Sequence, residues 1–196
     1  MESVGQSQLN TLLVALGEVL NSRGEHYEVV VIGGGNLILR ELVTRPTTKD
    51  VDILGEWTSA GVTQMKVIPE ALSRAIADVA LTYGLAGDWV NLGPASLLEL
   101  GLPEGFTTRV ERRDYGGLVV WFAGRFDMVC FKLYAAVDQG IRSRHHQDLL
   151  ELRPTHDELL RAAIWTVTHD PSPAFRSSLE SLLRDLGVEE IDASLD

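Results

Sequence analysis

Hydrophobic positions along the chain alternate between helical spacing and short apolar runs, which predicts an α/β protein. Residues 7–22 carry apolar side chains at intervals of three and four, as an amphipathic helix does. Residues 27–32 form an apolar run that suits a strand, and residues 50–54 alternate charged and β-branched side chains, as a strand with one buried face does. A helix is expected at residues 69–83, with Gly84 as its end.

The second half of the chain is predicted to be mostly helical after one hairpin. Asp114-Tyr115-Gly116-Gly117 is typical of a hairpin turn between two strands, at residues 106–113 and 118–122. The other predicted elements are helices at 36–43, 94–100, 127–138 and 147–152, further helices from 155 and from 171, and a loop at 55–67. We therefore predict a small mixed sheet flanked by helices in a core of residues 1–152, with a helical extension of residues 153–196 packed on it.

Composition narrows the class of protein. The content of 45% hydrophobic and 23% charged residues is that of a globular domain, and no stretch approaches the roughly 18 apolar residues that span a bilayer, so no membrane association is expected. The N-terminus lacks a secretory pattern, and the single cysteine, Cys130, fits a buried thiol in a reducing cytoplasm. A net charge of −11 argues against a surface that coats nucleic acid, although the arginines at 109–113 and 142–144 could hold a narrow polyanion.

The candidate chemistry lies in residues 30–54. Asp50 and Asp52 would project from one face of a strand while Val51 and Ile53 face the core. Two adjacent carboxylates repel each other unless a cation lies between them, and Mg²⁺ commonly takes one or two carboxylates together with substrate phosphates. We therefore predict that Asp50 and Asp52 bind Mg²⁺, with Mn²⁺ as the alternative ion.

A glycine turn precedes the two aspartates. Gly34 and Gly35 lie between a strand and a helix, where main-chain N–H groups can approach a phosphate closely. The turn lacks the third glycine of a dinucleotide fingerprint and the Gly-Lys-Ser/Thr of a Walker A loop. Asn36 or Arg40 could also meet phosphate oxygens. Each motif alone is commonly an ordinary turn or a solvated strand face, but together and in this order they indicate a nucleotide site.

These motifs resemble the signature of the DNA polymerase β nucleotidyltransferase superfamily, and more narrowly that of the AbiEii and MenT type toxins. The similarity covers roughly residues 26–152, and its most specific part is Gly34-Gly35 followed by Arg45-Pro-Thr-Thr-Lys-Asp50-Val-Asp52. The resemblance implies a polymerase β-type nucleotidyltransferase fold. It also implies an enzyme that transfers a nucleotide from an NTP substrate to an acceptor and releases pyrophosphate.

Those families also carry a later lysine and aspartate, which Lys132 and Asp148 match in order. The resemblance implies that Lys132 contacts the triphosphate, and that Asp148 acts as general base or orients Lys132. From the residues alone, a lysine in an apolar helical stretch usually extends along the helix surface into solvent. Asp148 could equally cap the short helix in which it lies.

Other residues near these motifs also bear on the site. Thr48 lies two residues before Asp50, so a continuous strand would put its hydroxyl beside the carboxylates at the nucleotide site. The resemblance implies control there, because a MenT toxin can be silenced by phosphorylation at the matching Ser or Thr. Asp88-Trp89-Val90-Asn91 also resembles these families, and we interpret Trp89 as a packed anchor rather than a nucleotide-stacking residue. The resemblance also implies a third metal carboxylate on a later strand, for which Glu111 and Asp114 are the nearby candidates, although neither lies in a recognisable motif.

The similarity to MenT toxins also implies an acceptor and a partner. It indicates the toxin of a toxin–antitoxin system, which adds nucleotides to the 3′ acceptor end of tRNA, blocks translation and is neutralised by a cognate antitoxin. The residues alone leave other possibilities open. These are a nucleotidyltransferase that modifies a protein side chain or a small molecule such as an antibiotic, and a catalytically inert binding partner.

Overall fold

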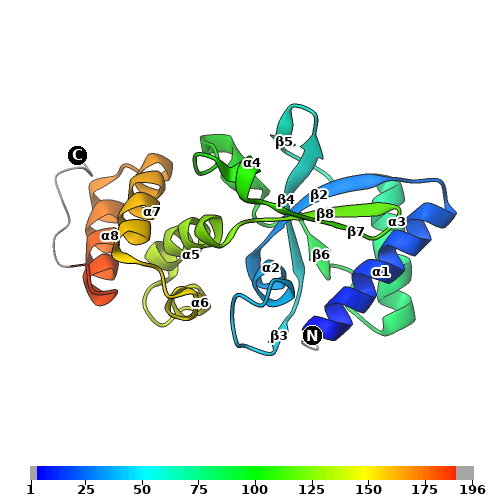
Figure 1. Cartoon of the computed structure of the whole chain (residues 1–196), viewed down its shortest axis with the longest axis horizontal. Helices are drawn as coiled ribbons and strands as arrows, with labels where there is room; N and C mark the ends of the chain where they lie inside the picture. Colours follow the sequence, from blue (N-terminus) through cyan, green and yellow to red (C-terminus); the bar gives the residue numbers. More distant parts are fainter. Residues whose placement is uncertain (1–3, 189–196) are drawn as a thin grey trace. The chain divides into compact units, whose positions relative to one another are not determined.

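A six-stranded mixed sheet organises the N-terminal part of the chain in the computed structural model, which describes residues 4–188 (Figure 1). The strands run in the order β5-β4-β2-β8-β7, and β6 pairs with β4. β2 is antiparallel to β4 and parallel to β8. The bounds are β2 Tyr27–Ile32, β4 Val51–Thr58, β5 Gly61–Thr63, β6 Val90–Asn91, β7 Glu111–Asp114 and β8 Leu118–Phe122.

Helices and a small second sheet complete the fold, and the predicted α/β class with a mixed sheet is confirmed. Two short strands, β1 (Val4–Gly5) and β3 (Thr47–Thr48), pair antiparallel. The helices are α1 Gln6–Ser22, α2 Gly33–Leu39, α3 Glu70–Tyr83, the 3₁₀ helix η1 Ala95–Leu100, α4 Phe106–Arg109, α5 Arg125–Gln139, α6 Arg144–Leu152, α7 His156–His169 and α8 Pro173–Asp185.

The main core lies between one face of the sheet and the helices α1 and α3. The apolar stripe of α1 is buried there, as its three-and-four spacing predicts. Alternate residues of β2, β4 and β8 face the same helices, so their neighbours in sequence point to the other face. The sheet residues in this cluster are Val29, Val31, Val51, Ile53, Leu118, Val120 and Phe122.

The contacts divide the chain after Gly124 into two compact units. In the second unit α5 packs on α6, α7 and α8. The capping box predicted at the start of α7 is present, with Thr155 and Glu158 each bonded to the main chain of the other. The division between residues 1–152 and 153–196 stays a prediction about domains, and residues 189–196 of that extension lie outside the described part.

Several segments differ from the predicted elements. The helix expected at residues 36–43 spans Gly33–Leu39, so the three glycines are its first residues. Residues 55–67 were expected to form a loop, but β4 continues to Thr58 and returns as β5. Gly55 lies where a β-carbon would overlap the main-chain oxygen of Thr63, so this glycine allows a close strand contact and does not end the strand. Residues 106–113 were expected to form one strand, but Phe106–Arg109 form the helical turn α4 and β7 begins at Glu111.

Membrane-spanning segments and the single cysteine were also the subject of predictions. Within residues 4–188, no helix is both long enough and apolar enough to cross a bilayer. Cys130 is a free cysteine and is buried, which confirms the expected small hydrophobic role for this side chain.

We expect Gly17→Ala to lower the free energy of unfolding by about 1–3 kcal/mol, the usual cost of overpacking. An alanine inside a helix is normally about 1 kcal/mol better than glycine. At Gly17, however, a β-carbon would overlap the main-chain carbonyl of Tyr115 in the β7–β8 turn. Gly87→Ala is the matched control, because nothing lies within 4 Å of the added atom. Urea unfolding of both variants measures the effect, and a more stable Gly17→Ala protein would contradict the packing described.

Candidate functional site

The glycine turn begins with a contact between Gly33 and Asp52. Gly33 has a left-handed φ of 72°, a conformation that favours glycine. A β-carbon on Gly33 would overlap the carboxylate of Asp52, so only a glycine lets the two segments approach this closely. Gly34 and Gly35 were predicted site residues, whereas Gly33 was not. Its signal was the unbroken run of three glycines after an apolar strand.

The next two glycines continue this close packing. A β-carbon on Gly34 would lie 2.6 Å from Oγ1 of Thr48 and 2.7 Å from Nη2 of Arg45, and one on Gly35 would lie 3.1 Å from the main-chain oxygen of Asp50. The guanidinium nitrogens of Arg45 are shielded from solvent. The turn therefore lies against the whole segment that leads into β4, with a buried positive charge at its second glycine.

Asp52 lies on β4 with the alternation that the sequence predicts. Val51 and Ile53 are buried in the core, whereas Asp52 is only half-buried and points to the opposite face. Its Oδ1 accepts a hydrogen bond of 3.2 Å from Nδ2 of Asn91 on the parallel strand β6. Asn91 is a further residue that the sequence analysis did not place at the site.

Asp50 and Thr48 lie outside β4. The predicted continuous strand through these residues is wrong, because β3 ends at Thr48 and β4 begins at Val51. Asp50 is half-buried, and Thr48 is 1% exposed with its hydroxyl 3.5 Å from the main-chain oxygen of Asp50. The hydroxyl of Thr48 lies against Gly34, at the glycine turn, and not on a shared strand face with Asp52.

The donor set fits Mg²⁺ better than a metal that the protein encloses fully. Asp50 and Asp52 supply carboxylates two residues apart, and residues 4–188 contain no group of three or more His, Cys, Asp or Glu that could hold a metal. Structural zinc sites need four protein ligands, whereas Mg²⁺ usually takes one or two carboxylates and completes its shell with water and substrate phosphates.

Asn36 fastens α2 to the sheet. Its side chain is fully buried, and Nδ2 donates to the main-chain oxygens of Val31, at 2.8 Å, and Ala123, at 3.2 Å. These bonds join the start of α2 to the ends of two neighbouring strands. The phosphate contact expected for Asn36 stays a prediction, and the contacts of the side chain are those of an anchor.

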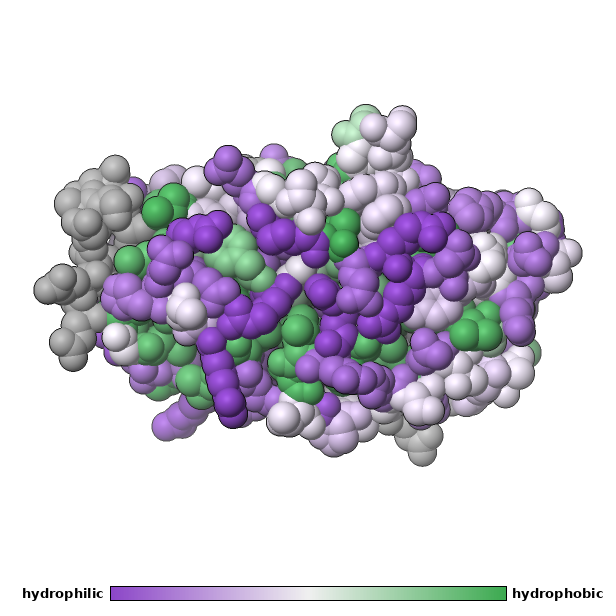
Figure 2. Space-filling model, viewed as in Figure 1, coloured by the Kyte–Doolittle hydropathy of each residue, from purple (hydrophilic) through white to green (hydrophobic). Residues whose placement is uncertain are grey.

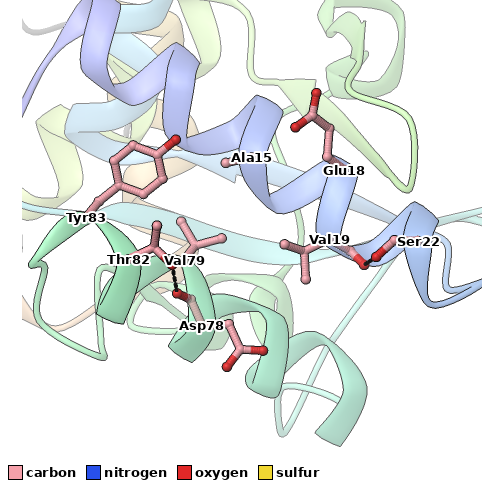
Figure 3. Close-up of a pocket in the computed structure, with 8 residues that line it drawn as sticks. All are labelled: Ala15, Glu18, Val19, Ser22, Asp78, Val79, Thr82 and Tyr83. Atoms are coloured by element: carbon pink, nitrogen blue, oxygen red, sulfur yellow. Dashed lines mark hydrogen bonds between the residues drawn. The ribbon is translucent and has the colours of Figure 1, made fainter.

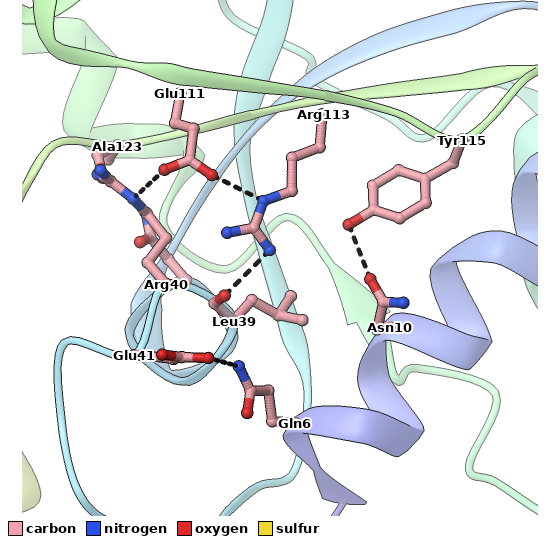
Figure 4. A network of polar contacts seen from close by, with 10 residues as sticks. Gln6, Asn10, Leu39, Arg40, Glu41, Glu111, Arg113, Tyr115 and Ala123 are labelled. Carbon is pink, nitrogen blue, oxygen red and sulfur yellow. Dashed lines mark hydrogen bonds and ion pairs between the residues drawn. The ribbon is translucent and has the colours of Figure 1, made fainter.

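Arg40 belongs to a second anchoring network at the other end of α2 (Figure 4). Its Nη1 donates to the main-chain oxygen of Ala123 at 2.7 Å, and its Nε lies 3.2 Å from Oε2 of Glu111. Arg113 donates from Nε to Oε1 of Glu111 at 2.7 Å and from Nη1 to the main-chain oxygen of Leu39 at 3.0 Å. The phosphate contact expected for Arg40 also stays a prediction.

The sheet order excludes Glu111 as a partner of Asp52 at one ion. Glu111 lies on β7, which is separated from β4 by β8 and β2. Neighbouring strands are about 4.8 Å apart, so the main chains at the two residues are roughly 14 Å apart, whereas Mg²⁺–oxygen bonds are about 2 Å long. Asp114 lies further along the same edge strand, paired with Arg112.

Two predicted catalytic residues form a buried ion pair within the second unit. Nζ of Lys132 lies 2.8 Å from Oδ2 of Asp148, and the side chains are 6% and 2% exposed. The interpretation that Lys132 extends into solvent is therefore wrong. Ser143 caps α6 by accepting a hydrogen bond from the main-chain N–H of His146, so Asp148 is not its cap. Removing one partner of a buried pair commonly costs 3–5 kcal/mol, because the other charge stays buried.

The arginine-rich stretches differ in how their charges are used. Arg112 pairs with Asp114 at 2.8 Å and Arg113 pairs with Glu111, so neither adds much free positive charge to the surface. In Figure 2, which has the same view as Figure 1, the surface over β7 is mostly hydrophilic. Arg142 and Arg144, before and at the start of α6, are exposed. These two are the better candidates for contact with a polyanion.

A cavity of about 300 Å³ lies between α1 and α3 (Figure 3). The sheet face that these helices cover is the one opposite to Asp52. Its charged lining residues are Glu18 and Asp78, and it has no basic lining residue. The cavity is therefore neither part of the candidate site nor suited to a phosphate.

Most of the chain matches one family model. The model described as "Nucleotidyltransferase of unknown function (DUF6036)" matches residues 7–161, a range that includes the glycine turn, both aspartates, Lys132 and Asp148. No curated protein and no solved structure matches the chain.

We expect Glu111→Gln to destabilise the protein at neutral pH by about 1 kcal/mol or less, since the carboxylate is partly exposed and its ion pairs are screened. Burial raises the pKa of Glu111, but the hydrogen bond and charge of Arg113, together with Arg40, hold it below the ordinary value of 4.5. A lowered folded-state pKa gives stability that is present above pH 4.5 and is lost as the pH falls through the folded pKa.

Urea unfolding of the wild type and Glu111→Gln at pH 7 and below pH 4 measures this difference. It should be largest at pH 7 and close to zero in acid. Exposed Glu18 on α1 provides the matched control Glu18→Gln, which removes a carboxylate outside this network. A difference between wild type and Glu111→Gln that grows in acid would contradict the network in Figure 4.

Proposed function

The chain belongs to the DUF6036 family of nucleotidyltransferases of unknown function, and from this premise we propose a specific reaction for it. In this proposal it is a Mg²⁺-dependent enzyme that transfers a nucleotide from an NTP to the 3′ acceptor end of tRNA. It thereby blocks translation, as the toxin of a toxin–antitoxin pair. The observation that supports the proposal most is the close fit of the glycine turn against the segment that carries Asp50 and Asp52.

The chemistry needs few protein groups. The oxygen of an acceptor hydroxyl forms a bond to the α-phosphorus, the bond from that phosphorus to the pyrophosphate oxygen breaks, and pyrophosphate is released. The hydroxyl proton passes to solvent water. When bound, Mg²⁺ neutralises phosphate charge and lowers the pKa of the attacking hydroxyl. In the proposal Asp50 and Asp52 hold the ion, and the main-chain N–H groups of Gly34 and Gly35 bind phosphate oxygens.

Lys132 and Asp148 have proposed roles that rest on the resemblance to MenT toxins. Lys132 contacts the triphosphate, and Asp148 orients it. The 2.8 Å ion pair supports an orienting role for Asp148, because it holds the ammonium of Lys132 in a fixed position.

The tRNA acceptor rests on the same resemblance, with modest support from charge. Exposed Arg142 and Arg144 could hold an RNA backbone despite the net charge of −11. The antitoxin partner likewise comes from the resemblance. The other acceptors, a protein side chain or a small molecule, use the same reaction centre and are distinguished by where the nucleotide is found.

We expect labelled nucleotide to appear at the 3′ end of tRNA after incubation with Mg²⁺ and at least one of the four NTPs. Asp50→Asn and Asp52→Asn should reduce transfer to background, because each removes a charged ligand of the ion without changing side-chain size. Gel mobility of purified tRNA measures the product. Glu18→Gln is the control and should retain full transfer, because Glu18 is exposed on α1, which covers the opposite face of the sheet.

The location of the label separates the alternatives. Label in protein or in a small molecule, with none in tRNA, would overturn the tRNA acceptor and keep the nucleotidyltransferase. No transfer from any NTP to total RNA, protein or small molecules would leave the inert binding partner. Full transfer by both aspartate variants would overturn the assignment of the site.

We expect Lys132→Arg to fold stably but to lower kcat/KM for the NTP by about 10²–10³-fold, the usual loss when one group that stabilises phosphate charge is misplaced. Arginine keeps a positive charge beside Asp148, but its planar fork does not reproduce an ammonium point charge. Lys132→Met should lose both activity and stability, because Asp148 would remain buried without its partner. Steady-state kinetics and thermal unfolding separate these effects, and an unchanged kcat/KM in both variants would remove Lys132 from the mechanism.

A further inference from the structure

We propose that Asn91 is a positioning residue, which holds the carboxylate of Asp52 in the orientation that binds the divalent ion. The inference deepens the proposed function and rests on it for the assignment of Asp52 as a ligand of the ion. Its basis is the hydrogen bond of 3.2 Å from Nδ2 of Asn91 to Oδ1 of Asp52, between paired residues of parallel strands.

The amide orientation of Asn91 follows from its other contact. Its Oδ1 accepts a hydrogen bond of 2.8 Å from the main-chain N–H of Gly93. A main-chain N–H can only donate, so the side-chain atom that faces Gly93 must be the oxygen. The opposite atom, which faces Asp52, is then the NH₂ group. Asn91 therefore presents a donor to the carboxylate and is not arranged as a third oxygen ligand.

Asp52 is consequently held from two sides. Oδ2 lies against Gly33, where even one added carbon would overlap it, and Oδ1 receives the amide of Asn91. A carboxylate on a flexible side chain must give up rotamer freedom to bind an ion. Contacts that fix its orientation beforehand remove part of this cost.

Asn91 is itself rigidly supported. The preceding Trp89 is 2% exposed, and its Nε1 donates to the main-chain oxygen of Ile76 in α3 at 3.1 Å. The main-chain oxygen of Trp89 accepts a bond of 2.7 Å from the N–H of Val51. The interpretation of Trp89 as a packed anchor is thus confirmed. This anchor fixes β6 beside β4. It therefore also fixes the position of Asn91 opposite Asp52.

A purely structural role makes a different prediction. If Asn91 serves only to accept from Gly93, any side chain that makes a similar turn should replace it. Serine can accept such a bond, although more weakly, but it is too short to reach Asp52 in place of the amide. Asn91→Ser therefore keeps the turn and removes the contact with the carboxylate, whereas Asn91→Ala removes both.

The experiment measures binding of Mn²⁺ alone to the full chain by electron paramagnetic resonance, without NTP. We expect Asn91→Ser and Asn91→Ala to weaken Mn²⁺ binding by about 10–100-fold, as loss of a group that orients a metal ligand usually does. The metal-free melting temperature of Asn91→Ser should stay at the wild-type value. Asn10→Ala is the matched control, since this exposed asparagine on α1 accepts a bond from Tyr115 on the covered side of the sheet.

Two further readouts separate positioning from general damage. Raising the Mn²⁺ concentration should restore nucleotide transfer by Asn91→Ser, because this variant binds the ion more weakly. It should not restore transfer by Asp52→Asn, which lacks the ligand. In the Asp52→Asn background, adding Asn91→Ser should weaken Mn²⁺ binding no further. Wild-type Mn²⁺ affinity in Asn91→Ser would overturn the inference.

Failure of the inference is distinguishable from failure of the proposed function. Mn²⁺ binding that depends on Asp52 and Asn91, in a protein that transfers no nucleotide, would support the inference and overturn the function. Nucleotide transfer by a protein whose Mn²⁺ affinity is unchanged by substitution of Asn91 would support the function and overturn the inference. A wild type without Mn²⁺ binding that depends on Asp52 would overturn both.

Discussion

The close approach of a glycine turn to a strand that carries an acidic residue is the constraint on which the candidate site depends. Gly33 combines a left-handed φ with a contact that leaves no room for a β-carbon beside Asp52. A glycine loses more conformational freedom on folding than other residues do, so three in succession are costly to order. The packing that offsets this cost places Gly33 directly against the carboxylate of Asp52.

Several charged side chains of this protein are held in place by ion pairs within the chain. Arg40 and Arg113 share Glu111, Arg112 pairs with Asp114, and Lys132 pairs with Asp148. Such pairing means that the surface charge cannot be read from the positions of arginines in the sequence. The stretch at 109–113, which looked like a basic patch, mainly joins the edge strand β7 to α2 and to its own turn.

Local signals were sufficient to predict much of the fold. α1, α3 and α7 have a helical period together with recognisable ends, and the turn before β8 carries its own sequence signature. The β4–β5 hairpin could not be predicted, because Gly55 suits a turn in isolation and its close contact with Thr63 exists only in the folded sheet. At the site, the two motifs were visible separately. The motif that contains Asn91 was also visible, but its contact with Asp52 and the burial of Lys132 join segments distant in sequence, which no local pattern records.

The burial of Thr48 has a consequence for any enzyme that would modify it. A kinase must bring its catalytic groups around an extended peptide, but this hydroxyl is enclosed against Gly34 and the side chain is 1% exposed. Modification therefore has to wait for local opening of the segment between α2 and β4, and its rate is limited by the fraction of molecules that are open. A nucleotide resting on the glycine turn would lower that fraction. Molecules with bound nucleotide would then be protected from modification at Thr48, and molecules without nucleotide would be modified first.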